Sequence, residues 1–142
     1  MSTYERDFYA WTQNQATLLR SHEFAHLDID NLSEEIEAMG RSERRQLTNR
    51  LEVLLAHLLK WQFQPERRGR SWRSTVSEQR RRIARLLRDN PSLQPDLPLL
   101  LADAYQDARH AAADETGLDV TIFPAASPYP LEDVLAAEWL PA

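Results

Sequence analysis

The strongest pattern along the chain is a run of apolar positions at helical spacing between residues 31 and 64. Ile36 and Leu47 are eleven residues apart, close to three whole turns, so the apolar stripe keeps its phase across Gly40. The pattern predicts one continuous helix on the order of 50 Å long, which ends at Pro65. The stripe consists of Leu32, Ile36, Met39, Leu47, Leu51, Leu54, Leu58 and Trp61.

A shorter amphipathic helix is predicted before this one. It begins at Ser2, which has capping-box spacing to Glu5, so each side chain is expected to satisfy a free backbone N–H of the other. Gln15 lies inside its apolar stripe, and the segment 21–30 that follows is less regular. The stripe consists of Tyr4, Phe8, Trp11, Leu18 and Leu19.

Two further helices are predicted after the long one. Ser71 is the expected cap of the third helix, which ends at Asn90–Pro91 because the residue before a proline disfavours helical geometry. The fourth begins no earlier than about Asp96 and ends at Gly117, the natural left-handed terminator.

The C-terminal part of the chain has a different character. Residues 119–130 hold three prolines and are expected to run extended over the surface, before a short helix over 131–138. Outside residues 119–123, no alternation of period two competes with this pattern. The fold class predicted is therefore all-α: a single domain over 1–142, built as an antiparallel bundle of four main helices plus a short C-terminal helix.

The amino-acid composition indicates the cellular compartment in which the protein is expected. The 142 residues include no cysteine, which excludes disulfides, thiolate nucleophiles and zinc–sulfur sites. The N-terminus lacks the basic and apolar regions of a secretory signal, and the apolar stretches are too short for a membrane span. We expect a cytoplasmic protein with no membrane partner.

The net charge of −5 conceals three blocks of opposite sign. Residues 1–40 carry −6, residues 41–88 carry +10 and residues 89–142 carry −9. The basic block is expected to be neutralised by the acidic flanks, with binding of a polyanion as the alternative.

One polar column runs along the long helix beside its apolar stripe. Glu43, Arg50, His57 and Gln64 recur every seven residues. Polar groups at the edge of a core need hydrogen-bond partners, so a boundary column satisfied by a neighbouring helix is the first interpretation. The alternative is a binding groove in which His57 titrates near neutral pH.

The spacing of Arg50 and His57 resembles the Arg–x–His signature of the HEPN ribonucleases, a small all-helical class. The resemblance implies an acid–base or orienting role for His57 and a phosphate contact for Arg50, with Lys60 nearby. With 17 basic side chains and four histidines in the chain, such a spacing also arises by chance.

Two other groups of residues are candidates for binding. His22 and His26 have the i, i+4 spacing that suits a metal ion on a helix, but no Glu-x-x-His pair accompanies them, so no metal or other cofactor is expected. The second group is a basic loop with Trp72 in its midst, suited to phosphates, although Trp72 lies on a core stripe. Its arginines are Arg67, Arg68, Arg70 and Arg73.

Sequence motifs along nearly the whole chain resemble a bacterial family known as domain of unknown function 29 (DUF29). The resemblance implies a compact helical domain and assigns no activity, cofactor or catalytic residue. The motifs are YERDFYAW, LDIDNLSEEIEAMG, RLEVLLAHLLKWQFQP, SWRSTVSEQR, NPSL, AYQDAR, ETGL and FPAASPYPLEDVL.

These patterns favour a non-enzymatic interaction or assembly module that contacts another protein through a helix face. A nucleic-acid-binding protein or ribonuclease using Arg50 and His57 is the second hypothesis, and a metal-binding bundle is the third.

Overall fold

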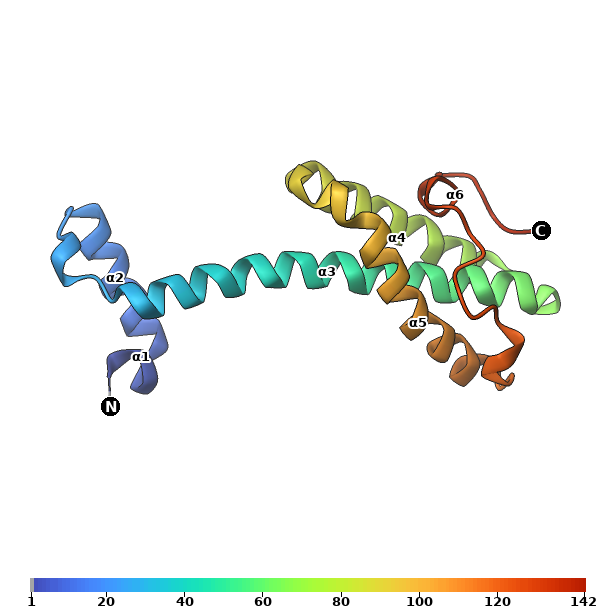
Figure 1. Cartoon of the computed structure of the whole chain (residues 1–142), viewed down its shortest axis with the longest axis horizontal. Coiled ribbons are helices and arrows are strands. Elements are labelled where there is room, and N and C mark those ends of the chain that lie inside the picture. The colour runs from blue at the N-terminus through green and yellow to red at the C-terminus, as the bar shows by residue number, and fades with distance from the viewer. Residues whose placement is uncertain (1) are drawn as a thin grey trace. The chain divides into compact units, whose positions relative to one another are not determined.

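The computed structural model describes residues 2–142, and helices make up most of this length (Figure 1). Four 3-10 turns connect the helices, at Phe24–His26, Pro65–Arg67, Pro91–Asp96 and Val120–Ile122. No strand occurs within residues 2–142, so the all-α class and the four main helices with a short C-terminal one are confirmed. The helices are α1 (Thr3–Arg6), α2 (Phe8–Arg20), α3 (Ile29–Phe63), α4 (Arg70–Asp89), α5 (Leu97–Thr116) and α6 (Leu131–Leu135).

Contacts group the residues into two compact units, and the boundary lies within α3, between Ser42 and Glu43. We refer to residues 2–42 as the N-terminal unit and to residues 43–142 as the C-terminal unit. The sequence pattern predicts one domain over the same length, because the apolar stripe of α3 continues across the boundary. None of the helices in the described part of the chain combines the length and apolarity that a membrane crossing requires.

The N-terminal unit begins with two helices where one is predicted. Asp7 interrupts the helix with an extended backbone (φ −150°), and its carboxylate accepts the N–H of Ala10 at 3.0 Å. Ser2 precedes α1 but makes no side-chain cap, so the predicted capping box with Glu5 is wrong. An aspartate five residues further on provides the same type of cap, and the longer helix begins there.

Asp28 fastens the irregular segment between α2 and α3. Its carboxylate Oδ2 accepts from Trp11 Nε1 at 2.9 Å and from Asn31 Nδ2 at 2.8 Å. Its backbone N–H donates to Gln15 Oε1 at 2.8 Å, which satisfies the polar residue in the apolar stripe of α2. The hydrogen bonds from Asn31 and then Trp11 favour the carboxylate and lower the pKa of Asp28.

Helix α3 runs unbroken through Gly40, which confirms the prediction from the phase of its apolar stripe. A Cβ added at Gly40 meets no atom within 4 Å.

We therefore expect Gly40→Ala to stabilise the protein by about 0.5–1 kcal/mol, because alanine loses less conformational entropy than glycine in a helix. Thermal melts of the two proteins measure the change, and a lower melting temperature for the alanine variant would refute the expectation.

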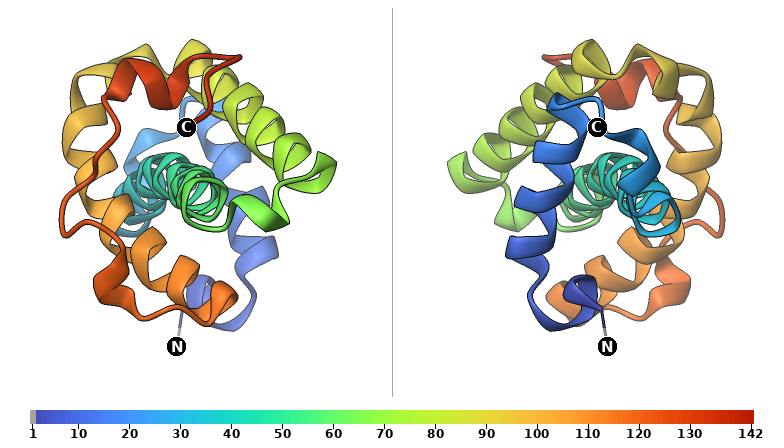
Figure 2. Two further views of the ribbon diagram at one scale, coloured as in Figure 1. Left: turned by 90° about the vertical axis from the view of Figure 1, so that its right-hand side faces the viewer. Right: turned by 90° about the vertical axis from the view of Figure 1, so that its left-hand side faces the viewer.

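The C-terminal unit is built around the last six turns of α3. Helix α4 returns antiparallel beside α3 (Figure 1), and the end-on views of Figure 2 show α4 and α5 on different sides of it. Its apolar core includes six leucines of α3 that are completely buried: Leu47, Leu51, Leu54, Leu55, Leu58 and Leu59. Burial of this continuous apolar face stabilises the unit.

The ends of α4 and α5 lie close to the capping, proline and glycine residues that predict them, with one difference at the start of α4. Gly69, not Ser71, is the N-cap residue of α4, which begins one residue before the predicted cap. Asp96 precedes α5, and Gly117 ends it in the left-handed conformation (φ 74°), both as predicted. Helix α6 covers 131–135, shorter than the predicted 131–138.

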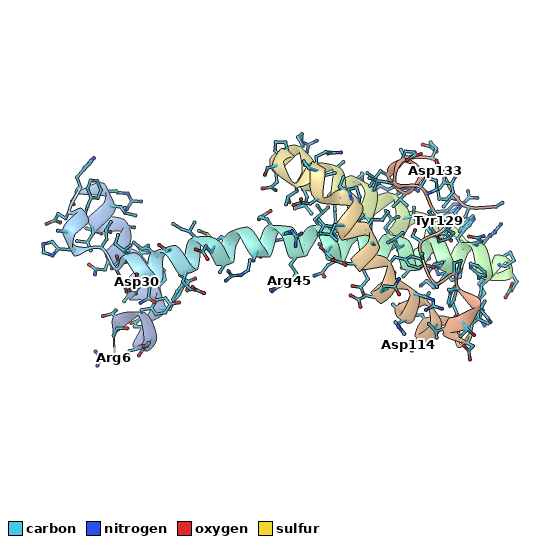
Figure 3. All side chains as sticks on the ribbon, in the orientation of Figure 1. Arg6, Asp30, Arg45, Asp114, Tyr129 and Asp133 are labelled. Atoms are coloured by element: carbon cyan, nitrogen blue, oxygen red, sulfur yellow. The ribbon has the colours of Figure 1, made fainter. Side chains whose placement is uncertain are left out.

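The segment 119–130 is anchored in the core, although it is predicted to run over the surface. Phe123 and Tyr129 are 1% and 6% exposed. Tyr129, labelled in Figure 3, donates its hydroxyl to Gln62 Oε1 of α3 at 2.7 Å. Helix α5 also binds backbone carbonyls of the segment: Tyr105 Oη donates to Pro124 O (2.6 Å), Gln106 Nε2 to Ala125 O (2.9 Å) and Arg109 Nε to Phe123 O (3.1 Å).

A buried arginine of α4 holds the C-terminal helix. Arg80 is 7% exposed, and its Nε donates to Val134 O at 2.8 Å. Its two terminal nitrogens lie 3.3 Å from Asp133 O and 3.4 Å from Ala137 O. Arg80 thereby supplies a donor to the carbonyl of Val134 in the last turn of α6 and to that of Ala137 beyond the helix, and it shares the carbonyl of Asp133 with the N–H of Ala136.

Candidate functional site

The polar column of α3 lies at the edge of the core, as its spacing predicts. Glu43, Arg50, His57 and Gln64 are all half-buried. Glu43 accepts a hydrogen bond from Asn90, at the end of α4, over 3.3 Å. His57 Nδ1 lies 2.9 Å from the carbonyl of Val53, one turn earlier in the same helix.

Arg50 and His57 belong to different surroundings. Arg50 lines a hollow between α3 and α4 whose other residues do not include His57; they are Glu43, Gln46, Arg82, Arg85, Leu86 and Asp89. Two helical turns, about 10 Å along the axis, separate the two side chains. Burial, helped by the charge of Lys60, lowers the pKa of His57 and favours its neutral form. The structure therefore does not bring the two residues together in one pocket.

Lys60 is a buried cation that links three helices. It is 7% exposed, and its Nζ lies 3.1 Å from Glu115 Oε2 of α5. The same ammonium lies 5.3 Å from the centre of the Trp72 ring of α4. Its contacts are those of a structural connection, since both sides of the ammonium are occupied by protein groups.

His22 and His26 do not share a helix. His22 has a positive φ of 58° in the turn after α2, and His26 lies in the 3-10 turn Phe24–His26. The premise of an i, i+4 metal pair on a helix is therefore wrong. Within residues 2–142, no three histidine, aspartate or glutamate side chains gather in a way that suits a metal ion.

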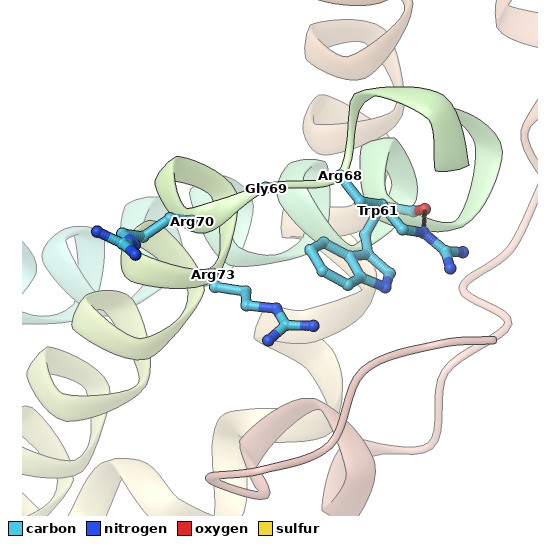
Figure 4. Close-up of a pocket in the computed structure, with 5 residues that line it drawn as sticks. All are labelled: Trp61, Arg68, Gly69, Arg70 and Arg73. Carbon is cyan, nitrogen blue, oxygen red and sulfur yellow. Dashed lines mark hydrogen bonds between the residues drawn. The ribbon is translucent and has the colours of Figure 1, made fainter.

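Three of the predicted loop arginines gather around a tryptophan, but it is not Trp72. Arg68, Arg70 and Arg73 line a surface hollow of about 420 Å³ together with Trp61 of α3 and Gly69 (Figure 4). Trp72 is instead engaged by Lys60. We refer to this hollow as the arginine pocket. Arg67 is exposed and does not line it.

Internal neutralisation of the basic block is confirmed at three of its residues: Arg41 pairs with Glu34 and Glu37 of the N-terminal flank, and two further cations pair with acidic residues of the C-terminal flank. Arg44 lies 3.9 Å from Asp96, and Lys60 pairs with Glu115. In α4, Arg82 pairs with Glu78 of the same helix at 2.8 Å. No carboxylate in the described part of the chain lies within 4 Å of the arginines of the loop: Arg67, Arg68, Arg70 and Arg73.

An apolar groove of about 410 Å³ crosses the N-terminal unit between α2 and the start of α3. Four of the side chains that line it are between 46% and 62% exposed: Phe8, Leu19, Ile36 and Met39. The sequence places these residues on apolar stripes, and we expected those stripes to be core. The remaining lining residues are Trp11, Thr12, Gln15, Ala16, Leu32 and Glu35.

The architecture defines an all-α protein whose two most distinct surface features are an apolar groove and an arginine pocket. The chain belongs to the family described as "Domain of unknown function DUF29", whose model matches residues 3–140. Neither the curated proteins nor the solved structures include a match to the chain. The family confirms the resemblance in the motifs and adds no activity.

Several of the sequence motifs contain residues that form hydrogen bonds with one another in the structure. AYQDAR supplies Tyr105, Gln106 and Arg109, and all three bind carbonyls in the motif that begins FPAAS. LDIDNL supplies Asp28, which binds Trp11 of the motif YERDFYAW. These motifs therefore include contacts that attach irregular segments to helices.

Proposed function

We propose that the protein is a non-enzymatic interaction module whose N-terminal unit binds an amphipathic helix of a partner protein. The observation that carries this proposal is the exposed apolar groove between α2 and α3. Large contiguous apolar surfaces are uncommon on soluble domains, and they mark binding sites where they occur. We also propose that the protein is cytoplasmic.

Exposed apolar side chains are concentrated in this unit. Nine large hydrophobic residues among those described are exposed, and seven of them lie in residues 2–42. The other two, Leu99 and Ile122, lie far from each other in the sequence of the C-terminal unit. The seven are Phe8, Tyr9, Leu19, Phe24, Ile29, Ile36 and Met39.

The shape and charge of the unit indicate the occupant. Two helices wall the groove, so a third helix that inserts an apolar face completes the packing, as in other helix-in-groove interactions. Residues 1–42 carry eight carboxylates against three arginines, a net charge of −5. A partner helix with basic flanks is therefore favoured, and a second copy of the same acidic unit is disfavoured by like-charge repulsion.

The test uses two designed 18-residue amphipathic peptides, one of leucine and lysine and one of leucine and glutamate. Fluorescence anisotropy of each labelled peptide against the full chain should show binding of the lysine peptide alone. Ile36→Asp places a charge in the groove and should weaken that binding by about tenfold or more, equivalent to about 1.4 kcal/mol. Leu99→Asp is the matched control, because Leu99 of α5 is 58% exposed and Ile36 is 60% exposed. The control should change the affinity less than about twofold.

Three outcomes would contradict the proposal. Equal binding of the two peptides would remove the charge argument, and equal effects of the two substitutions would remove the groove. A concentration-dependent dimer of the free protein, dissolved by Ile36→Asp, would assign the groove to a second copy of the chain. Light scattering across a range of protein concentrations detects that dimer.

A further inference from the structure

We propose that the arginine pocket of the C-terminal unit binds a phosphate monoester through Arg68 and Arg73. The proposal is independent of the groove, since it rests on side chains of the loop after α3 and of α4. A phosphate ligand is not required for the N-terminal unit to bind a partner helix.

Two guanidinium groups are held against one indole in this pocket. The Cζ atoms of Arg68 and Arg73 each lie 5.1 Å from the centre of the Trp61 ring. The two cations are therefore no more than about 10 Å apart. In Figure 4 the guanidinium of Arg68 lies beside the Trp61 carbonyl and that of Arg73 lies below the indole, so that the indole stands between them in this view, whereas Arg70 points away from Trp61.

Hydrogen bonding leaves the ends of these side chains available. Arg68 Nε donates to the carbonyl of Trp61 at 2.7 Å, which fixes the guanidinium, and its two terminal nitrogens have no acceptor among residues 2–142. Stacking on an aromatic ring covers the face of a guanidinium and leaves its donor edge free. The pocket thus presents oriented donors before any ligand arrives, which reduces the entropy lost on binding.

The positive charge of the arginine pocket favours binding of an anion. In residues 2–142 neither arginine has a carboxylate within 4 Å, so two like charges share the pocket uncompensated. A phosphate monoester carries up to two negative charges and three acceptor oxygens, which matches two guanidinium groups. A volume of about 420 Å³ leaves room for the organic part of a small ester.

Stacking of a nucleobase is not part of this site. Trp61 is 5% exposed, because the arginines cover it, and a base needs an open aromatic face. This burial separates the proposal from single-stranded RNA binding, the alternative that the basic block suggests. It favours recognition of a terminal phosphate group over a polynucleotide.

The test compares Arg73→Gln with Arg67→Gln by calorimetric titration of ribose 5-phosphate into the full chain. Both substitutions remove one exposed charge, but only Arg73 lines the pocket. Arg73→Gln should weaken binding by about tenfold or more, the effect of losing a charge-assisted hydrogen bond, and Arg67→Gln by less than about twofold. Arg73→Lys keeps the charge, loses the planar donor edge and should give an intermediate loss. Thermal melts confirm that each variant is folded.

A second arm distinguishes the source of the phosphate. A ten-nucleotide single-stranded RNA without terminal phosphates offers only diesters, and it should bind more weakly than ribose 5-phosphate. The proposal fails if ribose 5-phosphate does not bind, or if Arg67→Gln and Arg73→Gln weaken its binding equally. It also fails if the RNA binds more tightly with a steep salt dependence, which would indicate a diffuse polyanion surface.

Discussion

Replacing Phe123 with alanine is expected to lower the free energy of unfolding by about 3–5 kcal/mol, the cost typical of phenylalanine-to-alanine changes in a core. Phe123 is 1% exposed, and its ring lies edge-on to Phe63 of α3 with centroids 5.2 Å apart. The substitution leaves a cavity between α3 and the segment 119–130. It also loosens the backbone of residue 123, whose carbonyl accepts a hydrogen bond from Arg109.

Ile122→Ala is the matched control for this prediction. Ile122 precedes Phe123 in the same segment but is 47% exposed, so its truncation should cost less than about 1 kcal/mol. Urea unfolding of the three proteins measures the difference. Equal losses for the two variants would show that the segment is not anchored in the core through Phe123.

The second large effect is expected for Arg80→Met, with a loss of about 2–3 kcal/mol. Methionine fills much of the space of the arginine side chain but cannot donate hydrogen bonds. The carbonyls of Val134 and Ala137 then lose their donors, whereas that of Asp133 keeps the N–H of Ala136. Buried carbonyls without partners cost about 1–3 kcal/mol each, and water regains part of this cost at the longer contact to Ala137.

Arg81→Met removes the same charge from the adjacent position. Arg81 is exposed and donates to Ser77 of its own helix, so the change should lie within about 0.5 kcal/mol. Amide hydrogen exchange gives a local readout, because the amides of α6 should exchange faster in the Arg80 variant alone. Similar exchange in both variants would contradict the role assigned to Arg80.

Local signals account for the parts of the fold that the sequence predicts well. The phase of apolar positions on both sides of Gly40 predicts the continuity of α3, and Pro65, Asn90–Pro91 and Gly117 predict three helix ends. The signals for the helix ends act within about one helical turn, and the phase of the apolar stripe is set within a single helix. The sequence does not predict the interruption at Asp7, because Ser2 and Asp7 are both suitable cap residues.

The candidate sites depend on which element covers which face, and periodicity does not contain that information. A helical stripe shows that Ile36 and Met39 share an apolar face, but not that this face is left open. Trp61 and Trp72 both lie on apolar stripes, and only the arrangement of the loop places Arg68 against Trp61. Summed charges failed for Arg80 in the same way, since its partners are carbonyls rather than carboxylates.

The most direct test of the interaction module is an NMR titration of the methionine methyl groups. The chain contains two methionines, Met1 and Met39, so selective labelling gives two signals that a Met39→Leu variant assigns. Met39 lines the groove and is 62% exposed. The leucine–lysine peptide is expected to shift the Met39 methyl signal progressively to saturation, and the leucine–glutamate peptide is expected to leave it in place. An unmoved Met39 signal at a peptide concentration where anisotropy shows saturation would place the binding elsewhere and contradict the account.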